Sequence, residues 1–116
     1  MKVIVAGSRN IQAPYHVAQA IYSSPFSVSE IVSGGARGVD TLGEHWAYEH
    51  ARPVTKFVPD WDKFGKGAGF RRNDQMAEYA DALIAVWDGK SKGTEHMIKT
   101  MEALGKPVHV HRVDAT

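Results

Sequence analysis

The sequence predicts an α/β fold: a three-layer, Rossmann-like sandwich with a five-stranded, mostly parallel sheet. The first observation is a set of five short runs rich in β-branched or apolar residues, at 3–6, 29–33, 54–58, 82–87 and 107–111. The second is that apolar residues recur at intervals of three and four between these runs, as on one face of a helix. Strands that alternate with helices at this pace are typical of a parallel sheet covered by helices on both faces, and we expect the strand order 3-2-1-4-5.

The five predicted strands differ in how continuously apolar they are. Residues 3–6 and 82–87 carry only apolar side chains, which predicts central strands buried on both faces. The other three runs contain polar residues and suit flanking or edge positions in the sheet.

Four helices are predicted between the strands. Their apolar residues with helical spacing are Val17, Ala20 and Ile21; Leu42, Trp46 and Ala47; Met76, Ala77 and Ala80; and Met97, Ile98, Met101 and Leu104. The last helix should end at Gly105, because a glycine with a proline soon after it is a typical helix stop. Residues 59–69 show no clear periodicity and predict a flexible loop of the kind that often binds ligands.

Length and composition narrow the class of protein. The 116 residues suit a single domain spanning 1–116, and no apolar run approaches the roughly 18 residues of a membrane span. With no cysteine, the chain has no disulfide, thiol nucleophile or cysteine-ligated metal. His109 and His111 share a strand face without a nearby carboxylate, so we expect no metal site, and we expect no cofactor. The formal net charge of +1 gives no global attraction to nucleic acid or membranes. Because no apolar run is long enough to span a membrane, we expect a cytoplasmic protein.

The loops that follow the strands are the candidate sites, because ligands of open parallel sheets bind beyond the carboxyl ends of the strands. Gly7, Ser8 and Arg9 follow the first strand and either approach a ligand or form a tight turn. The second strand leads into a glycine-rich loop before a helix, which predicts an anion site built from backbone amides. Its residues are Ser33, Gly34, Gly35, Arg37 and Gly38, followed by Asp40. Asp40 either caps the helix or contacts ribose hydroxyls.

Two further segments predict phosphate contacts. A second helix start follows the fourth strand and carries Asp88, Gly89, Ser91, Gly93 and Thr94. It is either a phosphate site or a capped helix with solvated lysines beside it. Arg72 and Asn73 lie at the start of the third helix, where a cation opposes the helix dipole unless an anion is bound. Since the first and fourth strands are the central ones, their loops should face one crevice.

These four segments, taken in order, resemble the SLOG superfamily, which joins the Smf/DprA DNA-processing proteins and the LOG hydrolases. The motifs are Gly7-Ser-Arg9, Ser33-Gly-Gly-Ala-Arg-Gly-Val-Asp40, Arg72-Asn73-x-x-Met76 and Gly89-x-Ser91-x-Gly93-Thr94. The chain is most similar to the small YspA, or cpYpsA-related, SLOG family, over residues 2 to about 110. The resemblance implies a Rossmann-like domain, found in bacteria and their phages, that binds nucleotides or derivatives such as ligands related to ADP-ribose.

The resulting hypothesis is a module that binds a phosphorylated nucleotide or nucleotide derivative as a sensor, carrier or sequestering protein. LOG-like hydrolysis of nucleoside 5'-monophosphates is one alternative, in which Arg72 matches the family's arginine. The position of the LOG catalytic glutamate, however, holds Met97, and Asn73 replaces the lysine, so we favour binding over catalysis.

Binding of single-stranded DNA is the other alternative. It would use a basic groove made of Lys63, Lys66, Arg71, Arg72, Lys90 and Lys92, although acidic residues lie between them. We also expect a homodimer or larger homo-oligomer, for which Trp46, Met97 and Met101 either offer apolar helix faces or pack in the core.

Overall fold

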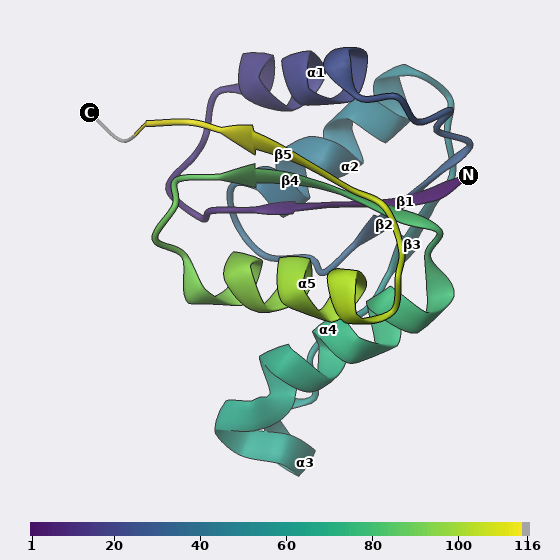
Figure 1. The fold of residues 1–116 in the computed structure, drawn as a ribbon. Helices are drawn as coiled ribbons and strands as arrows, with labels where there is room; N and C mark the ends of the chain where they lie inside the picture. Colours follow the sequence, from purple (N-terminus) through teal and green to yellow (C-terminus); the bar gives the residue numbers. More distant parts are fainter. Residues whose placement is uncertain (115–116) are drawn as a thin grey trace.

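The computed structural model describes residues 1–114 and has the predicted three-layer α/β architecture. Five strands form one sheet in the order β3-β2-β1-β4-β5, as predicted, and every strand pair is parallel. Helices cover both faces of this sheet (Figure 1). The elements are β1 (Lys2–Gly7), α1 (Pro14–Ser23), β2 (Glu30–Ser33), α2 (Val39–Glu49), β3 (Val54–Lys56), α3 (Trp61–Phe64), the 3-10 helix η1 (Gly65–Gly67), α4 (Ala68–Tyr79), β4 (Ala82–Trp87), α5 (Lys92–Ala103) and β5 (Val108–Arg112).

Alternation along the central strand divides the core into two layers. Val3 and Val5 of β1 pack toward α1 and α2, whereas Ile4 and Ala6 pack toward α4 and α5. Successive side chains of a strand point to opposite faces, so a continuously apolar strand fills both layers. β4 follows the same rule, with Ile84 in the first layer, and both central strands are buried as predicted.

The edge strands β3 and β5 are the more polar runs, and they are partly exposed. This confirms the sequence-based distinction between central and flanking strands. Among residues 1–114, no helix is long and apolar enough to cross a membrane.

Residues 59–69 are not the predicted loop. They form α3 and η1 and lead directly into α4, and together these helices project from the body of the molecule (Figure 1). The Asp60 carboxylate accepts the backbone N–H of Lys63 at 3.1 Å and caps α3. The Arg71 guanidinium lies 4.3 Å from the centre of the Phe64 ring, so α4 packs back on α3. Capping and a cation–π contact stabilise this segment without the apolar periodicity that predicts a helix.

Of the two explanations open for Trp46, Met97 and Met101, core packing holds for the two methionines. Met97 and Met101 are 1% and 0% exposed and belong to the core between α5 and the sheet, so they offer no surface to a partner. Trp46 is half-buried against the other core layer.

Candidate functional site

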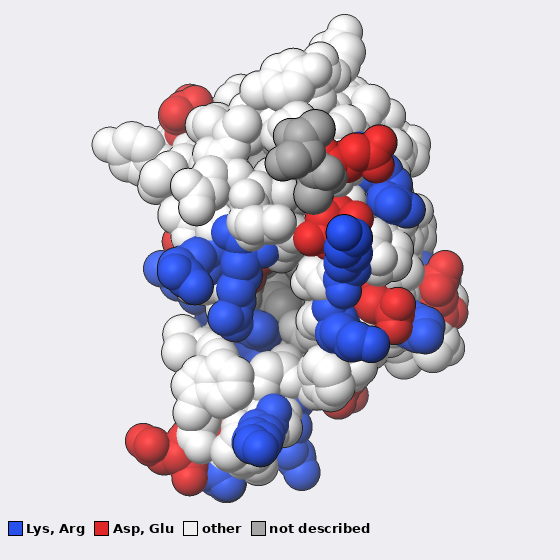
Figure 2. Space-filling model, turned by 90° about the vertical axis from the view of Figure 1, so that its left-hand side faces the viewer, with Lys and Arg blue, Asp and Glu red and all other residues white. Residues whose placement is uncertain are grey.

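A cavity of about 370 Å³ lies at the carboxyl ends of β1 and β4. The chain leaves these neighbouring strands toward opposite sides of the sheet, which is where open α/β sheets bind ligands. Figure 2 shows this edge of the molecule as a hollow with Lys and Arg side chains on both sides. The lining residues are Ala6, Gly7, Ser8, Arg9, Asn10, Ala36, Asp40, Arg72, Asn73, Met76, Asp88, Ser91, Gly93, Thr94 and Met97.

The loops after β1 and β4 are fastened to each other. The buried Ser8 hydroxyl accepts the backbone N–H of Asp88 at 3.0 Å, and the Ser8 N–H donates to the Val86 carbonyl at 3.1 Å. A Cβ on Gly7 would lie 2.0 Å from that same carbonyl oxygen, so only glycine fits where the two strands end together. The floor of the cavity is therefore held by direct bonds between its two central loops.

Asp88 and Ser91 shape the start of α5. The Asp88 carboxylate accepts the N–H of Lys90 at 2.8 Å and that of Ser91 at 2.9 Å, and these bonds hold the pKa of Asp88 below its usual value. The Ser91 hydroxyl caps the helix by accepting the N–H of Thr94 at 3.4 Å.

The first amides of α5 are left open. The N–H groups of Lys92 and Gly93 have no hydrogen-bond acceptor among residues 1–114. Nothing lies within 4 Å of a Cβ built on Gly93. The first turn of a helix lacks internal acceptors and carries the positive end of the helix dipole, so this turn can accept an anion.

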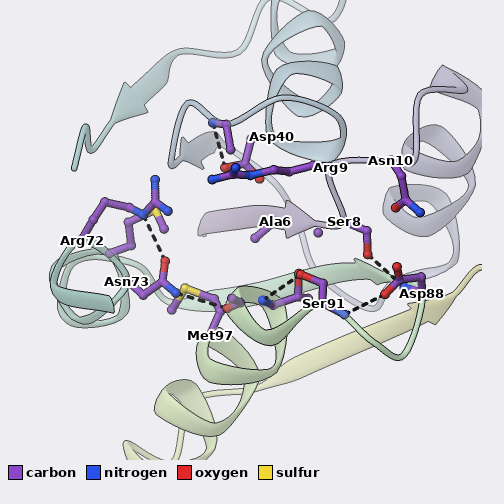
Figure 3. Close-up of a pocket in the computed structure, with 15 residues that line it drawn as sticks. Ala6, Ser8, Arg9, Asn10, Asp40, Arg72, Asn73, Asp88, Ser91 and Met97 are labelled. Carbon is purple, nitrogen blue, oxygen red and sulfur yellow. Dashed lines mark hydrogen bonds between the residues drawn. The ribbon is translucent and has the colours of Figure 1, made fainter. Parts of the chain in front are cut away.

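Arg72 and Asn73 bridge three elements from α4. The Arg72 guanidinium donates to the Gly34 carbonyl after β2 and, through Nε, to the Asn73 side-chain oxygen at 3.1 Å. The Asn73 amide donates in turn to the Gly93 carbonyl at 3.2 Å. Arg72 lies in the second turn of α4, not at its start as the sequence suggested, because the helix begins at Ala68. This chain of bonds fixes a half-buried guanidinium at the cavity wall (Figure 3).

Asp40 is a buried carboxyl on the same side of the cavity as Arg72, and both side chains approach Gly34. It lies in the first turn of α2, and it does not cap that helix, whose N-cap is Gly38. Its carboxylate accepts the N–H of Ala36 at 3.2 Å.

Burial raises the pKa of Asp40 to about 6, although the Ala36 N–H and the nearby Arg72 charge favour the ionised form. Burial also lowers the pKa of Arg72, while the Asp40 charge acts to raise it. A Cβ on Gly34 would lie 2.6 Å from Arg72 Nη1 and 2.9 Å from Asp40 Oδ2, so this glycine makes room for both side chains.

The structure brings many of the predicted residues to one cavity and leaves others outside it. Those that line it are Gly7, Ser8, Arg9, Asp40, Arg72, Asn73, Asp88, Ser91, Gly93 and Thr94. Those that do not line it are Ser33, Gly34, Gly35, Arg37, Gly38 and Gly89.

The glycine-rich loop after β2 binds largely to itself. The Gly35 N–H donates to the Ser33 hydroxyl at 3.1 Å, and the Ala36 N–H is taken by Asp40. The loop therefore uses two of its amides to hold its own side chains, and it positions Asp40 and Arg72.

Sequence reasoning missed the apolar part of the lining. Ala6, Met76 and Met97 come from β1, α4 and α5, and their helical or strand pattern assigned them to the core. Met97 follows Thr94 by three residues and so shares its helix face, which was the available signal. Asn10 was also missed, although it directly continues the Gly7-Ser8-Arg9 segment. A methionine at position 97 offers no acidic or basic group to a bound molecule.

Comparison with known proteins gives three matches of different strength. A model of the YspA, cpYpsA-related SLOG family matches residues 1–64. The Gene 61 protein of Mycobacterium phage D29 is 32% identical over 117 residues, covering 92% of this chain and 93% of the phage protein.

The X-ray structure of DNA processing protein A (DprA) from Streptococcus pneumoniae superposes with a TM-score of 0.75 at 20% identity. That match covers 92% of this chain but 48% of DprA, so the chain spans about half the length of that protein. At this identity the likeness concerns the fold. The family match over more than half of the chain and the phage relative along nearly all of it agree with the ordered motifs around the cavity, and the chain belongs to the YspA, cpYpsA-related SLOG family.

Proposed function

We propose that this protein binds a phosphorylated nucleotide or nucleotide derivative, such as a ligand related to ADP-ribose, in the cavity at the ends of β1 and β4. The observation that carries the proposal is the convergence of the open α5 amides with two arginines on one cavity. The volume of about 370 Å³ falls within the roughly 300–1,000 Å³ typical of small-molecule sites.

A phosphate group has one favoured position in this cavity. At the first turn of α5 it would accept the N–H groups of Lys92 and Gly93 and meet the Thr94 hydroxyl. Arg9 and Arg72 line the same cavity and supply the countercharge, and an arginine fork suits phosphate oxygens. The Asp88 carboxylate also lines the cavity, and it is occupied by the Lys90 and Ser91 amides.

The remaining walls suit the uncharged part of a nucleotide. Ala6, Met76 and Met97 form the apolar floor of the cavity, and because they are only 7%, 1% and 1% exposed, a base or sugar ring would touch just the small part of them that faces the cavity. The Asn73 amide and Asp40 provide polar contacts beyond it. A ligand with one charged end and one flat, apolar end fits this division.

The test is a calorimetric titration with AMP, ADP-ribose and adenosine. Both phosphorylated ligands should bind, and adenosine should bind at least about tenfold more weakly, because it lacks the group that meets the α5 amides. Native mass spectrometry of the protein purified from cells would identify a ligand that co-purifies. Recovery of free base and ribose phosphate in place of an intact nucleotide would indicate turnover and contradict a pure binding role.

Two substitutions at one position give the matched control. Gly93→Asp places a carboxylate where the phosphate would lie, and it should reduce AMP affinity at least about tenfold. The helix itself favours an acidic residue in its first turn, so this variant should fold. Gly93→Ala has open space around its Cβ and should keep AMP affinity within about threefold of the original. Equal affinity of Gly93→Asp and Gly93→Ala would refute the phosphate position.

Salt dependence separates this proposal from DNA binding. A single bound phosphate ester involves few released ions, whereas an oligonucleotide lying across several cations loses affinity steeply with added salt. Tight, salt-sensitive binding of single-stranded DNA, with no binding of AMP or ADP-ribose, would overturn the nucleotide proposal.

A further inference from the structure

The outer surface of α1 is unusual in this chain because it carries no Lys, Arg, Asp or Glu side chain. The segment 10–29, which contains α1 and the residues on both sides of it, includes none of these four residue types, although they make up 23% of the sequence. In Figure 2 the top of the molecule, which holds α1, is white, while red and blue residues lie at its left and right edges and around and below the hollow. An exposed helix without charged side chains is only weakly stabilised by contact with water, and exposed apolar patches of this kind often mark contact sites.

Large aromatic side chains stand on this surface. Tyr15 and Tyr22 are 63% and 89% exposed, and they lie two helical turns apart with the exposed Ala18 between them. The opposite stripe of the same helix, formed by Val17, Ala20 and Ile21, is buried in the core. Thus the exposed side of α1 carries aromatic and small side chains with the uncharged polar residues Gln19 and Ser23, and only the buried side has a partner within the described chain.

A groove runs beside the two tyrosines, between α1 and α2. It has a volume of about 410 Å³ and is lined by Tyr15, Ala18, Gln19, Ile21, Tyr22, Trp46 and His50. The Trp46 and His50 rings stack with their centres 4.2 Å apart at 16°, which gives the groove a flat wall. We call the outer side of α1 together with this groove the α1 face.

We propose that the α1 face is the interface at which a second copy of this chain docks in a two-fold dimer. In a two-fold interface each patch meets its own copy, so any charge near the axis would face a like charge. The α1 helix has no such charge and is compatible with itself. Nucleic acid or lipid headgroups would need cations on this face, and residues 10–29 supply none.

The shape of the face also fits a second copy. The small Ala18 lies at the centre of the outer stripe, so two α1 helices can cross closely there, with tyrosines on either side. Tyrosine and tryptophan are the side chains that most often carry the binding energy of protein interfaces. An interface of standard size takes about 800 Å² from each partner, so such a dimer would bury about an eighth of the 6527 Å² surface of this chain.

The dimer would leave the nucleotide cavity open. The cavity lies at the carboxyl edge of the sheet, whereas the α1 face is the outer surface of the helix layer on one side of the sheet (Figures 1 and 2). Dimerisation and ligand binding are therefore measured independently, and the failure of one proposal does not imply the failure of the other.

The first test is sedimentation velocity over a range of protein concentrations. The unmodified chain should sediment as a dimer, and Tyr22→Lys should weaken association at least about tenfold, because it removes an aromatic contact and brings a charge into the interface. Val58→Lys is the matched control, since Val58 is 73% exposed and lies between β3 and α3, away from the α1 face. It should remain dimeric. A monomeric unmodified chain at about 100 µM, or a Tyr22→Lys variant that dimerises normally, would overturn the proposal.

The second test uses the absence of natural cysteines. Ala18→Cys should form a disulfide-linked dimer under mild oxidation, because residues next to a two-fold axis come within the Cα separation of about 4.4–6.8 Å that a disulfide needs. Val58→Cys should remain uncrosslinked under the same conditions. Equal crosslinking of the two variants would place the contact elsewhere and overturn the assignment of the α1 face.

Discussion

Asp40 offers the sharpest test of the site, because its environment predicts a specific change of stability with pH. Its pKa is about 6 in the folded protein and 3.8 for an unperturbed carboxyl, with burial as the main cause. The folded state therefore holds a proton more tightly than the unfolded state. Wherever the folded state binds more protons, stability falls as pH rises. Between about pH 4 and pH 6, ionisation of Asp40 should destabilise the free protein.

The magnitude follows from the two pKa values. The full difference between 3.8 and about 6 corresponds to about 3 kcal/mol, reached only well below pH 3.8. From pH 7 to pH 4 the linkage relation gives about 2 kcal/mol of added stability from this carboxyl alone. Asp88 acts in the opposite direction, because hydrogen bonds from the Lys90 and Ser91 amides lower its pKa and its contribution is lost as pH falls. A single protein measured alone would therefore mix opposing effects.

The assay compares the unmodified protein with Asp40→Asn by urea unfolding, followed by far-UV circular dichroism, at pH 7 and at pH 4. Asparagine has nearly the same shape but does not titrate. From pH 7 to pH 4, the free energy of unfolding of the unmodified protein should rise by about 2 kcal/mol relative to that of Asp40→Asn, because the two proteins share all other titrating groups. Parallel pH dependence of the two proteins, within about 0.5 kcal/mol, would refute the argument that Asp40 is a buried carboxyl with a raised pKa.

Three further predictions concern the backbone around the cavity and are measured by the same urea unfolding at pH 7. Gly7→Ala should destabilise the protein by about 3 kcal/mol or prevent folding, because its Cβ would lie 2.0 Å from the Val86 carbonyl oxygen; unchanged stability would contradict the close approach of β1 and β4. Ser91→Ala should destabilise by about 1 kcal/mol through loss of the α5 cap, and a Ser91→Asp variant, which keeps a capping oxygen, should recover most of it. Gly93→Ala should stabilise by about 0.5 kcal/mol, since alanine restricts the unfolded chain and meets open space in the folded one; a loss of stability would mean that the first turn of α5 is more crowded than described.

The sequence by itself determined the layers, the strand order and the general position of the site. Local periodicity distinguishes strands from helices, and the continuously apolar runs 3–6 and 82–87 can only be central strands of a sheet covered on both faces. Once β1 and β4 are central, their loops meet at one edge, which is why Ser8, Asp88 and Gly93 were predicted together and line one cavity.

Tertiary structure alone decided how the site is built. Arg72 reaches the Gly34 carbonyl across 38 positions of sequence, and this bond depends on how α4 packs beside β2. In the glycine-rich loop the amides of Gly35 and Ala36 donate to the Ser33 and Asp40 side chains, a pairing that no spacing rule predicts.

The segment 59–69 is helical because Asp60 caps it and Arg71 contacts the Phe64 ring. Met97 lines the cavity because α5 begins where β4 ends. Periodicity records which side of an element is apolar. It does not record which other element lies opposite, and the contacts, burial and pKa values of this cavity depend on that arrangement.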